Sequence, residues 1–359
     1  MSRFRILNRP RAALCTALSL SLTLPGLAVA QQVAPLPLAQ PTAAPAAPGC
    51  QPDVAGLTTL TLTSGGQART ALVYRPASAD PVARLPVVLT LHGSESNAAE
   101  QLERSGLEQT ADRAGFVVVA PQGVVPAGQG FRWNVPGVTQ AGPTPPDDEA
   151  YLTDVIRAVT TQRCADAERV YATGYSGGAR MISQYACDVP GVLAAIAPVA
   201  GLRAGVPVPD GSVPGGAAPN GAGRPGLMPD PASCAPRTGV PIITFQGTAD
   251  PVNPYAGGGA AYWGYGAEQA LSRWAALNRC RVGPFTRQVS AHVRQTRYLA
   301  CRDGARIEAY VIAGGGHTWP GNVAAFRALP TLGPTTDEIN ASDLIWTFVQ
   351  PYTRLPVAR

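Results

Sequence analysis

Short, continuously apolar runs alternate along this chain with segments of helical periodicity. The first two apolar runs are LPVVLTL (85–91) and GFVVVA (115–120). Strands buried on both faces have this pattern, because neither face meets water. Strands that alternate with helices imply a mostly parallel sheet with right-handed crossovers, so the sequence predicts an α/β fold with helices flanking a central sheet. Four further runs are expected strands: RVYATG (169–174), LAAIAPV (193–199), VPIITF (240–245) and RIEAYVI (306–312).

Helical periodicity is clearest at 147–162, directly after a Pro-Pro-Asp start signal. Residues 266–280 and 341–350 are two more expected helices, and 57–76 predicts an antiparallel hairpin at one edge of the sheet. Residues 201–238 break the alternation, because they are rich in glycine, proline and alanine. A loop this long is usually functional or disordered, so it is either a cap over a site or a surface insertion.

Residues 1–30 have the composition of a secretory signal peptide. Four arginines precede an apolar stretch, and Ala28-Val29-Ala30 supplies small residues for cleavage. The stretch is too short for a stable membrane span, so we expect a secreted protein, extracellular or in the cell envelope. Those arginines carry most of the net charge of +5, and the rest of the chain has no excess charge that would attract nucleic acid.

Residues 31–49 are rich in proline and alanine and predict a flexible leader. One catalytic domain is expected at 50–356, with the insertion at about 201–238. Six cysteines remain after cleavage, an even number that suggests three disulfides in an exported protein, with 15 connectivities open. A metal site is the rival interpretation, but there is no C-x-x-C pair and only three histidines, so no metal is expected.

The segment ATGYSGGAR (172–180) contains the pattern G-x-S-x-G around Ser176. In a chain with 39 glycines, a short pattern of this kind can also be an ordinary tight turn. Here an expected strand runs directly into Ser176 and an expected helix follows it. That is the context of a nucleophile elbow, which exposes the serine hydroxyl at the edge of the sheet.

A serine nucleophile needs a base, which is itself oriented by an acid. Two histidines follow Ser176: His292 in a polar alternating stretch, and His317 in a glycine-rich loop after a strand. A loop at the carboxyl end of a strand reaches the same edge as Ser176, so His317 is the expected base. Asp250 follows the preceding strand and is the expected acid, although an aspartate before Pro251 can also be a plain turn residue. The remaining candidates Asp210, Asp230 and Asp303 lie in less suitable contexts.

The order Ser, acid, His is that of the α/β-hydrolase fold. In that fold the oxyanion is bound by two backbone N–H groups. We expect one from Gly177, after the nucleophile, and one from Ser94 in LTLHGSESN (89–97). His92 is expected to hold this loop by hydrogen bonds.

The motifs H-G-S, G-Y-S-G-G, G-T-A-D-P and G-H-T-W-P-G occur in this order. Together they resemble the secreted polyhydroxybutyrate-depolymerase-like and feruloyl esterases of carbohydrate esterase family one, in the α/β-hydrolase superfamily. The resemblance covers roughly Cys50 to Tyr352. It implies Ser176 as nucleophile, Asp250 as acid, His317 as base, and Ser94 with Gly177 around the oxyanion.

The leading hypothesis is therefore a secreted serine esterase of the feruloyl or acetylxylan type, acting on a polysaccharide-linked or small aromatic ester. The mechanism of such a serine esterase needs no cofactor. The alternatives are a depolymerase of poly(3-hydroxybutyrate) or hydroxyalkanoate oligomers, a peptidase on the same fold, and a non-catalytic envelope binding protein. Trp133 and Trp319 flank the expected site loops and are candidates for the substrate cleft, with a core role as the alternative.

The expected fold narrows the disulfides. Cys164 precedes the strand that leads to Ser176, and Cys187 ends the helix that returns from it. Because both paths cover similar heights, the sequence predicts a Cys164–Cys187 bond. The remaining cysteines are expected to form Cys280–Cys301 and Cys50–Cys234.

Overall fold

The computed structural model describes residues 44–45, 51, 54–80, 83–139, 142–210 and 226–355. The signal peptide predicted at 1–30 lies outside the described residues, as does the predicted leader except for one strand. That strand, β1 (Ala44–Pro45), pairs antiparallel with β4 (Ala83–Arg84). All described residues belong to the unit Leu38–Arg359.

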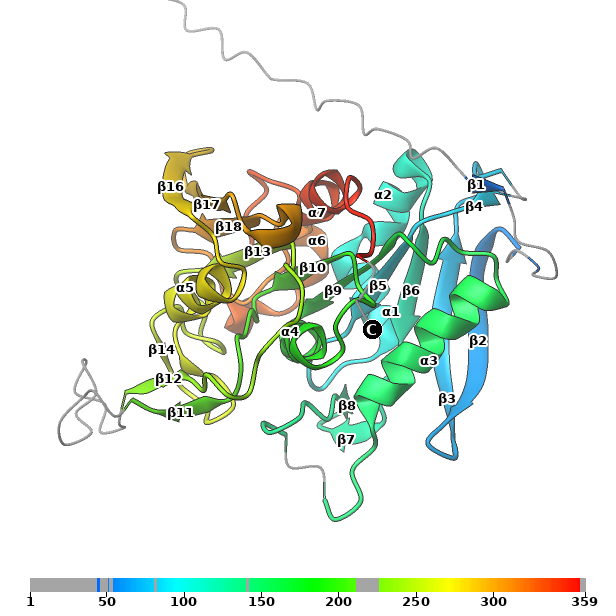
Figure 1. Ribbon diagram of the computed structural model, residues 1–359, viewed down its shortest axis with the longest axis horizontal. Helices are drawn as coiled ribbons and strands as arrows, with labels where there is room; N and C mark the ends of the chain where they lie inside the picture. Colours follow the sequence, from blue (N-terminus) through cyan, green and yellow to red (C-terminus); the bar gives the residue numbers. More distant parts are fainter. Residues whose placement is uncertain are drawn as a thin grey trace, which may run out of the picture. The chain divides into compact units, whose positions relative to one another are not determined.

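Ten strands form one sheet in the order β16-β17-β18-β13-β10-β9-β5-β6-β3-β2 (Figure 1). The six strands from β18 to β6 are parallel, and an antiparallel hairpin extends the sheet at each edge. The mostly parallel sheet predicted from the apolar runs is therefore confirmed. The strands are β2 (Gly56–Ser64), β3 (Gln67–Arg75), β5 (Val87–Leu91), β6 (Val117–Pro121), β9 (Val170–Tyr175), β10 (Ala195–Val199), β13 (Ile242–Gly247), β16 (Val282–Gln288), β17 (Val293–Leu299) and β18 (Ile307–Ile312).

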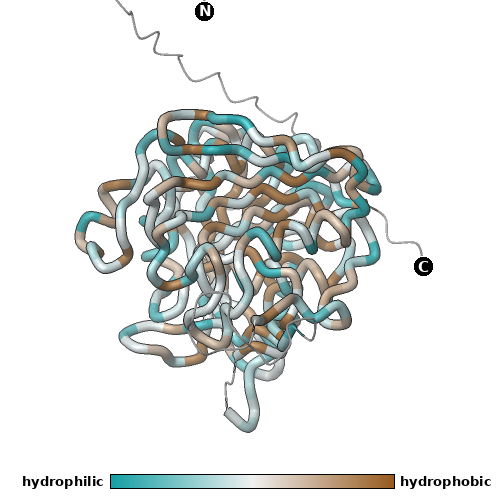
Figure 2. Tube along the Cα trace, turned by 90° about the vertical axis from the view of Figure 1, so that its left-hand side faces the viewer, coloured by the Kyte–Doolittle hydropathy of each residue, from teal (hydrophilic) through white to brown (hydrophobic). Residues whose placement is uncertain are grey.

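Helices cover both faces of the sheet. One core cluster joins one set of strand side chains to α3, α4 and α5, and a second joins the alternate set to α1, α2, α6 and α7. Since neighbouring strand residues point to opposite faces, an unbroken apolar run supplies both clusters. Hydrophobic residues accordingly follow the strands through the middle of the fold in Figure 2. The helices are α1 (Ala98–Ser105), α2 (Leu107–Ala114), α3 (Asp148–Thr161), α4 (Gly177–Asp188), α5 (Ala267–Leu277), α6 (Val323–Phe326) and α7 (Ala341–Val349).

The described parts of the insertion 201–238 contain two short strands that pair antiparallel. Among the described residues, no helix is both long and apolar enough to cross a membrane. The remaining short elements are β7 (Val125–Ala127), β8 (Gly130–Arg132), β11 (Pro207–Pro209), β12 (Leu227–Pro229), β14 (Gly257–Gly258), β15 (Gly264–Tyr265) and the 3₁₀ turns Arg302–Gly304 and Pro330–Leu332.

The disulfides correct part of the predicted connectivity. Cys280–Cys301 is present as predicted, but Cys187 is bonded to Cys234. The predictions Cys164–Cys187 and Cys50–Cys234 are therefore wrong. Near its end, the insertion passes beside α4, where the Gln184 side chain donates to the Ser233 carbonyl (3.0 Å), and this brings Cys234 to Cys187. Cys164 is disulfide-bonded as well, whereas Cys50 lies outside the described residues.

Glu149, in the first turn of α3, makes stability depend on pH. Burial and the neighbouring carboxylate of Asp188 raise its pKa to about 7. Between its ordinary pKa of about 4.5 and pH 7, the unfolded chain releases this proton while the folded chain keeps it. The free energy of unfolding contributed by this group therefore falls as pH rises through that window.

We expect Glu149→Gln to remove this pH dependence. The amide mimics the protonated carboxyl, so at pH 8 the variant should melt roughly 3 °C above the wild type, with little difference at pH 4. Thermal unfolding followed by circular dichroism from pH 4 to 8 measures this, with the exposed Glu168→Gln as control. Parallel pH curves for wild type and Glu149→Gln would contradict the assignment.

Candidate active site

Ser176 lies in the sharp turn between β9 and α4. Its backbone has φ 53° and ψ −111°, its N–H donates to the Val199 carbonyl (3.0 Å), and α4 starts at the next residue. Gly174 and Gly178, which flank Ser176 in the motif, lie so close to neighbouring backbone atoms that a side chain at either position would clash. A Cβ on Gly178 would lie 2.3 Å from the Leu91 oxygen, and one on Gly174 would lie 2.6 Å from the Gly178 carbonyl carbon. These contacts account physically for the G-x-S-x-G spacing.

Asp250 and His317 come together from the loops after β13 and β18. The His317 Nδ1–H donates to Asp250 Oδ2 (2.7 Å), and both side chains are buried. The ionised carboxylate can only accept, so Nδ1 carries the proton and Nε2 keeps a free lone pair. The loops themselves touch closely, since a Cβ on Gly247 would lie 2.1 Å from the Gly315 oxygen.

Asp250 is fixed by further hydrogen bonds from its own loop and from β13. Its Oδ1 accepts from the backbone N–H groups of Val252 (2.9 Å) and Asn253 (2.7 Å). Its Oδ2 accepts from the Gln246 amide (2.9 Å) as well as from His317. Four donors around one carboxylate leave it a single orientation.

Tyr175 joins the His317 loop to the elbow, a role that the sequence motifs did not predict. Its hydroxyl donates to the His317 carbonyl (2.5 Å), and the two rings lie 5.0 Å apart. Because Tyr175 directly precedes Ser176, the loop carrying His317 is attached to the elbow. No hydrogen bond joins the Ser176 hydroxyl to His317 within the described structure. In hydrolases free of substrate this contact is often long and tightens on binding.

Ser94 and Gly177, the expected oxyanion residues, are neighbours. A Cβ on Gly177 would lie 3.1 Å from the Ser94 backbone nitrogen and 2.6 Å from its hydroxyl oxygen. A Cβ on Gly93 would lie 3.4 Å from the Ser176 Cβ. Thus the turn after β5 lies directly against the elbow, where its N–H groups can meet a carbonyl attacked by the serine.

His92 holds this turn from inside the core, as expected. Its Nδ1–H donates to the Gly93 carbonyl (2.8 Å), and its Nε2 accepts from the Gly123 N–H (3.0 Å). Burial lowers the pKa of His92 to about 4, so the ring is neutral at physiological pH. The Trp133 indole donates to the His92 carbonyl (2.8 Å) and packs against its ring.

A pocket of about 540 Å³ opens beside the Ser94–Gly177 pair, and we call it the oxyanion-side pocket. Trp133 lines it and is also buried in the core, so the cleft role and the core role predicted for this residue both stay open. No residue from the described parts of 201–238 contributes to the lining. The lining consists of Ser94, Glu95, Ala127, Arg132, Trp133, Val135, Val138, Thr139, Gly177, Arg180, Ala261 and Tyr262.

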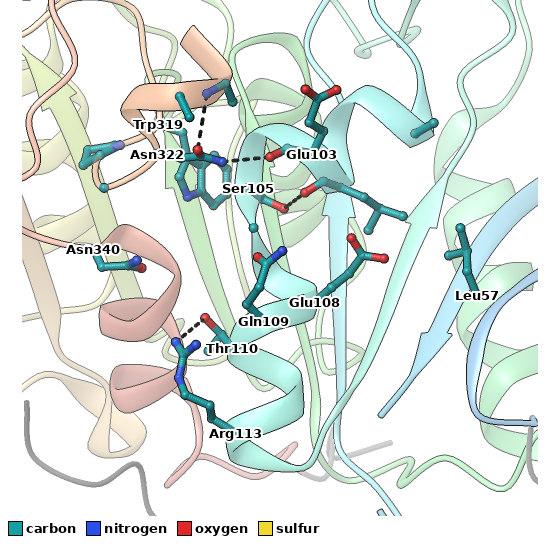
Figure 3. A pocket seen from close by; sticks show the side chains of 17 residues that line it. Leu57, Glu103, Ser105, Glu108, Gln109, Thr110, Arg113, Trp319, Asn322 and Asn340 are labelled. Atoms are coloured by element: carbon teal, nitrogen blue, oxygen red, sulfur yellow. Dashed lines mark hydrogen bonds between the residues drawn. The ribbon is translucent and has the colours of Figure 1, made fainter. Parts of the chain in front are cut away.

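Trp319 lies elsewhere, and its position favours the core role that was the alternative to a cleft role. It is buried in the core cluster around α7, and its indole donates to the Ser342 hydroxyl (3.1 Å). It lines a separate pocket of about 670 Å³ beside α1 and α2, where Asn322 donates to the Glu103 carbonyl (Figure 3). Two residues beyond His317 the chain has thus turned back into the core.

His292, the histidine that the sequence disfavoured, is exposed on the hairpin beside β17 and bonds to Glu338 (2.5 Å). It does not join the other site residues. Within the described ranges, no group of three or more His, Cys, Asp or Glu side chains is arranged to hold a metal ion.

Residues 69–212 match a protein family described as Esterase PHB depolymerase. Over 283 residues, 74% of each chain, this protein is 27% identical to the putative esterase NocK of Nocardia uniformis subsp. tsuyamanensis. It is 29% identical to feruloyl esterase B of Piromyces equi over 65% of this chain but only 39% of that relative. Poly(3-hydroxyalkanoate) depolymerase C of Paucimonas lemoignei is 34% identical over 33% of this chain and 28% of its own length.

Solved structures confirm the fold. An acetyl xylan esterase from Aspergillus awamori superposes with a TM-score of 0.51 at 15% identity, covering 73% of this chain and 94% of its own. A thermostable esterase superposes with a TM-score of 0.50 at 16% identity, over 83% of this chain and 63% of its own. The predicted α/β-hydrolase fold is therefore correct.

Proposed function

We propose that this carboxylic ester hydrolase, which carries a domain of the Esterase PHB depolymerase family at residues 69–212, works through Ser176, His317 and Asp250. The observation that carries the proposal is the buried His317–Asp250 hydrogen bond, at the sheet edge where the elbow presents Ser176. A binding protein on this scaffold would have no use for a buried, fully hydrogen-bonded acid–base pair beside such a turn.

In the proposed reaction, the Ser176 hydroxyl attacks the ester carbonyl while His317 Nε2 takes its proton. The developing oxyanion is bound by the N–H groups of Ser94 and Gly177, at the positive N-terminus of α4. His317 then gives the proton to the leaving alcohol, and an acyl-enzyme remains on Ser176. Water activated by His317 hydrolyses that acyl-enzyme, and Asp250 orients the imidazole and stabilises its charge in both halves.

For the substrate, we propose the ester of a plant polysaccharide or a small aromatic ester, of the feruloyl or acetylxylan type. The relatives include feruloyl esterase B and a bifunctional acetylxylan esterase/xylanase of Neocallimastix patriciarum, which supports this choice. The second candidate is an oligomer of a 3-hydroxyalkanoate, favoured by the family description and by the depolymerase relative. We also infer export, because disulfides such as Cys187–Cys234 persist in oxidising compartments.

Two measurements on residues 31–359 test the proposal. A fluorophosphonate should add its mass to the peptide that contains Ser176, because only an activated serine reacts with it. Hydrolysis of methyl ferulate, acetylated xylan and a 3-hydroxybutyrate trimer should then rank the substrates. Folded protein that takes up no label and cleaves none of these esters would favour a binding protein instead.

A further inference from the structure

Arg180 is a buried cation in the first turn of α4, four residues after the proposed nucleophile. Only 6% of the Arg180 surface is exposed, yet Arg180 is one of the residues that line the oxyanion-side pocket. The Tyr262 ring covers one side of the guanidinium at 4.2 Å. Its hydrogen bonds are long, at 3.4 Å to the Ser94 hydroxyl and 3.5 Å to Asn253 Oδ1.

Within the described part of the chain, no carboxylate pairs with Arg180, and its Nε–H has no partner. Arg69, another buried arginine, differs from it by forming a 2.7 Å ion pair with Asp148. An unpaired buried charge is costly, so proteins seldom keep one without a use. Burial lowers the pKa of Arg180 to about 10, which still leaves it charged at neutral pH.

A second buried arginine, Arg203, interacts electrostatically with Arg180. Arg203 stacks on Tyr265 (3.3 Å) and Trp263 (4.7 Å), and its positive charge acts on Arg180. Glu95, the acidic residue of the lining, is exposed to solvent. Arg180 and Gly177, the first residue of α4, thus line the pocket together, while Arg203 contributes only through its charge on Arg180. Both the guanidinium and the helix N-terminus favour an anion.

We propose that Arg180 binds a free carboxylate of the substrate, so that the preferred substrates are esters bearing a carboxylate near the scissile bond. Nη2 would lie 3.4 Å from a Cβ on Gly177, so a carboxylate here is a few bonds from a carbonyl bound by Gly177. A planar guanidinium with underused donors matches a carboxylate with two parallel hydrogen bonds. This inference rests on the proposed esterase function and narrows its substrate class.

A purely structural role is the alternative, because Arg180 also links α4 to Asn253 in the acid loop. That link is 3.5 Å long, near the limit for a hydrogen bond, and it uses one of five N–H donors. A structural role would make a substitution lower the turnover of all esters equally. Carboxylate binding would make it lower only that of anionic esters.

Matched ester pairs test the proposal. Mono(4-nitrophenyl) glutarate carries its carboxylate on the acyl side, and its methyl-capped form is neutral. The 3-hydroxybutyrate dimer carries its carboxylate on the alcohol side, and its methyl ester is neutral. We expect the wild type to favour the anionic member of at least one pair by kcat/KM, which identifies the side. A preference for the neutral member in both pairs would overturn the inference.

Arg180→Gln should lower the anionic-to-neutral ratio of kcat/KM by about 10- to 100-fold, the range for a lost hydrogen bond to a charged group. Arg180→Lys should restore part of the ratio, and the surface variant Arg157→Gln, which breaks an exposed pair with Asp154, should leave it unchanged. An unchanged ratio in Arg180→Gln would overturn the inference.

A binding measurement separates this inference from the esterase proposal. Calorimetry with glutarate should show binding to Ser176→Ala protein that is lost in the double variant with Arg180→Gln. If the wild type hydrolyses no ester, the esterase proposal fails while the carboxylate site is still decided by glutarate. Equal glutarate binding by both proteins, or none by either, would overturn the carboxylate site.

Discussion

Replacing Ser176 with alanine is expected to lower kcat for ester hydrolysis by about 10⁶-fold, the loss seen when a serine nucleophile is removed. The substitution deletes one hydroxyl that makes no hydrogen bond within the described structure. Alanine has the same Cβ as serine, so the backbone at φ 53° meets no new atom. The N–H of residue 176 still donates to the Val199 carbonyl. Folding should therefore survive, and a residual rate of about 10³-fold over water should remain from the oxyanion donors.

Rates on the preferred ester, together with thermal unfolding, would measure this. Ser78→Ala, which removes an exposed hydroxyl bonded to the Asp112 carbonyl, is the matched control and should retain full activity. A Ser176→Ala protein that stays folded and loses less than about 10²-fold would contradict the nucleophile assignment, because such a loss matches a lost contact rather than a lost nucleophile.

The parallel strands and the candidate triad could be predicted from the sequence because they depend on local signals. An apolar run buried on both faces predicts a strand wherever it occurs. Ser176, Asp250 and His317 each lie in the turn or loop that follows such a run. Parallel strands place their carboxyl ends at one edge, so the order of the motifs was enough to group the loops. Grouping the three loops therefore required no knowledge of the distances between their residues.

Predictions that needed the path of a loop failed. The Cys164–Cys187 bond was argued from strand and helix lengths, but the route of residues 226–238 past α4 follows no periodic pattern. Trp319 lies two residues from His317 in sequence, yet its side chain points into the core, because the turn between them was not predictable. Tyr175 occupies an x position of the G-x-S-x-G motif and Arg180 lies two residues beyond it, so no motif marked their roles.

Asp250→Asn should lower kcat by about 10⁴-fold while leaving the fold intact, as replacing a triad aspartate does elsewhere. The new amide oxygen can still accept the hydrogen bonds that the N–H groups of Val252 and Asn253 donate to Oδ1. The amide NH₂ would then face His317 Nδ1 and the Gln246 amide, where the carboxylate oxygen accepts two hydrogen bonds. Two donors cannot share that contact, so His317 is driven to the tautomer with its proton on Nε2, where it cannot accept the serine proton.

Kinetics and thermal unfolding of Asp250→Asn, beside Asp303→Asn, would separate catalysis from folding. Asp303 also accepts a backbone N–H, from Gly239 (2.7 Å), but it lies outside the candidate site. Its variant should keep wild-type kcat, since the same chemical change is made away from His317. If Asp250→Asn retained more than about a tenth of wild-type kcat, another acid would have to orient His317, because a wrong tautomer alone costs several powers of ten. A loss of similar size in Asp303→Asn would instead indicate that kcat reports local folding.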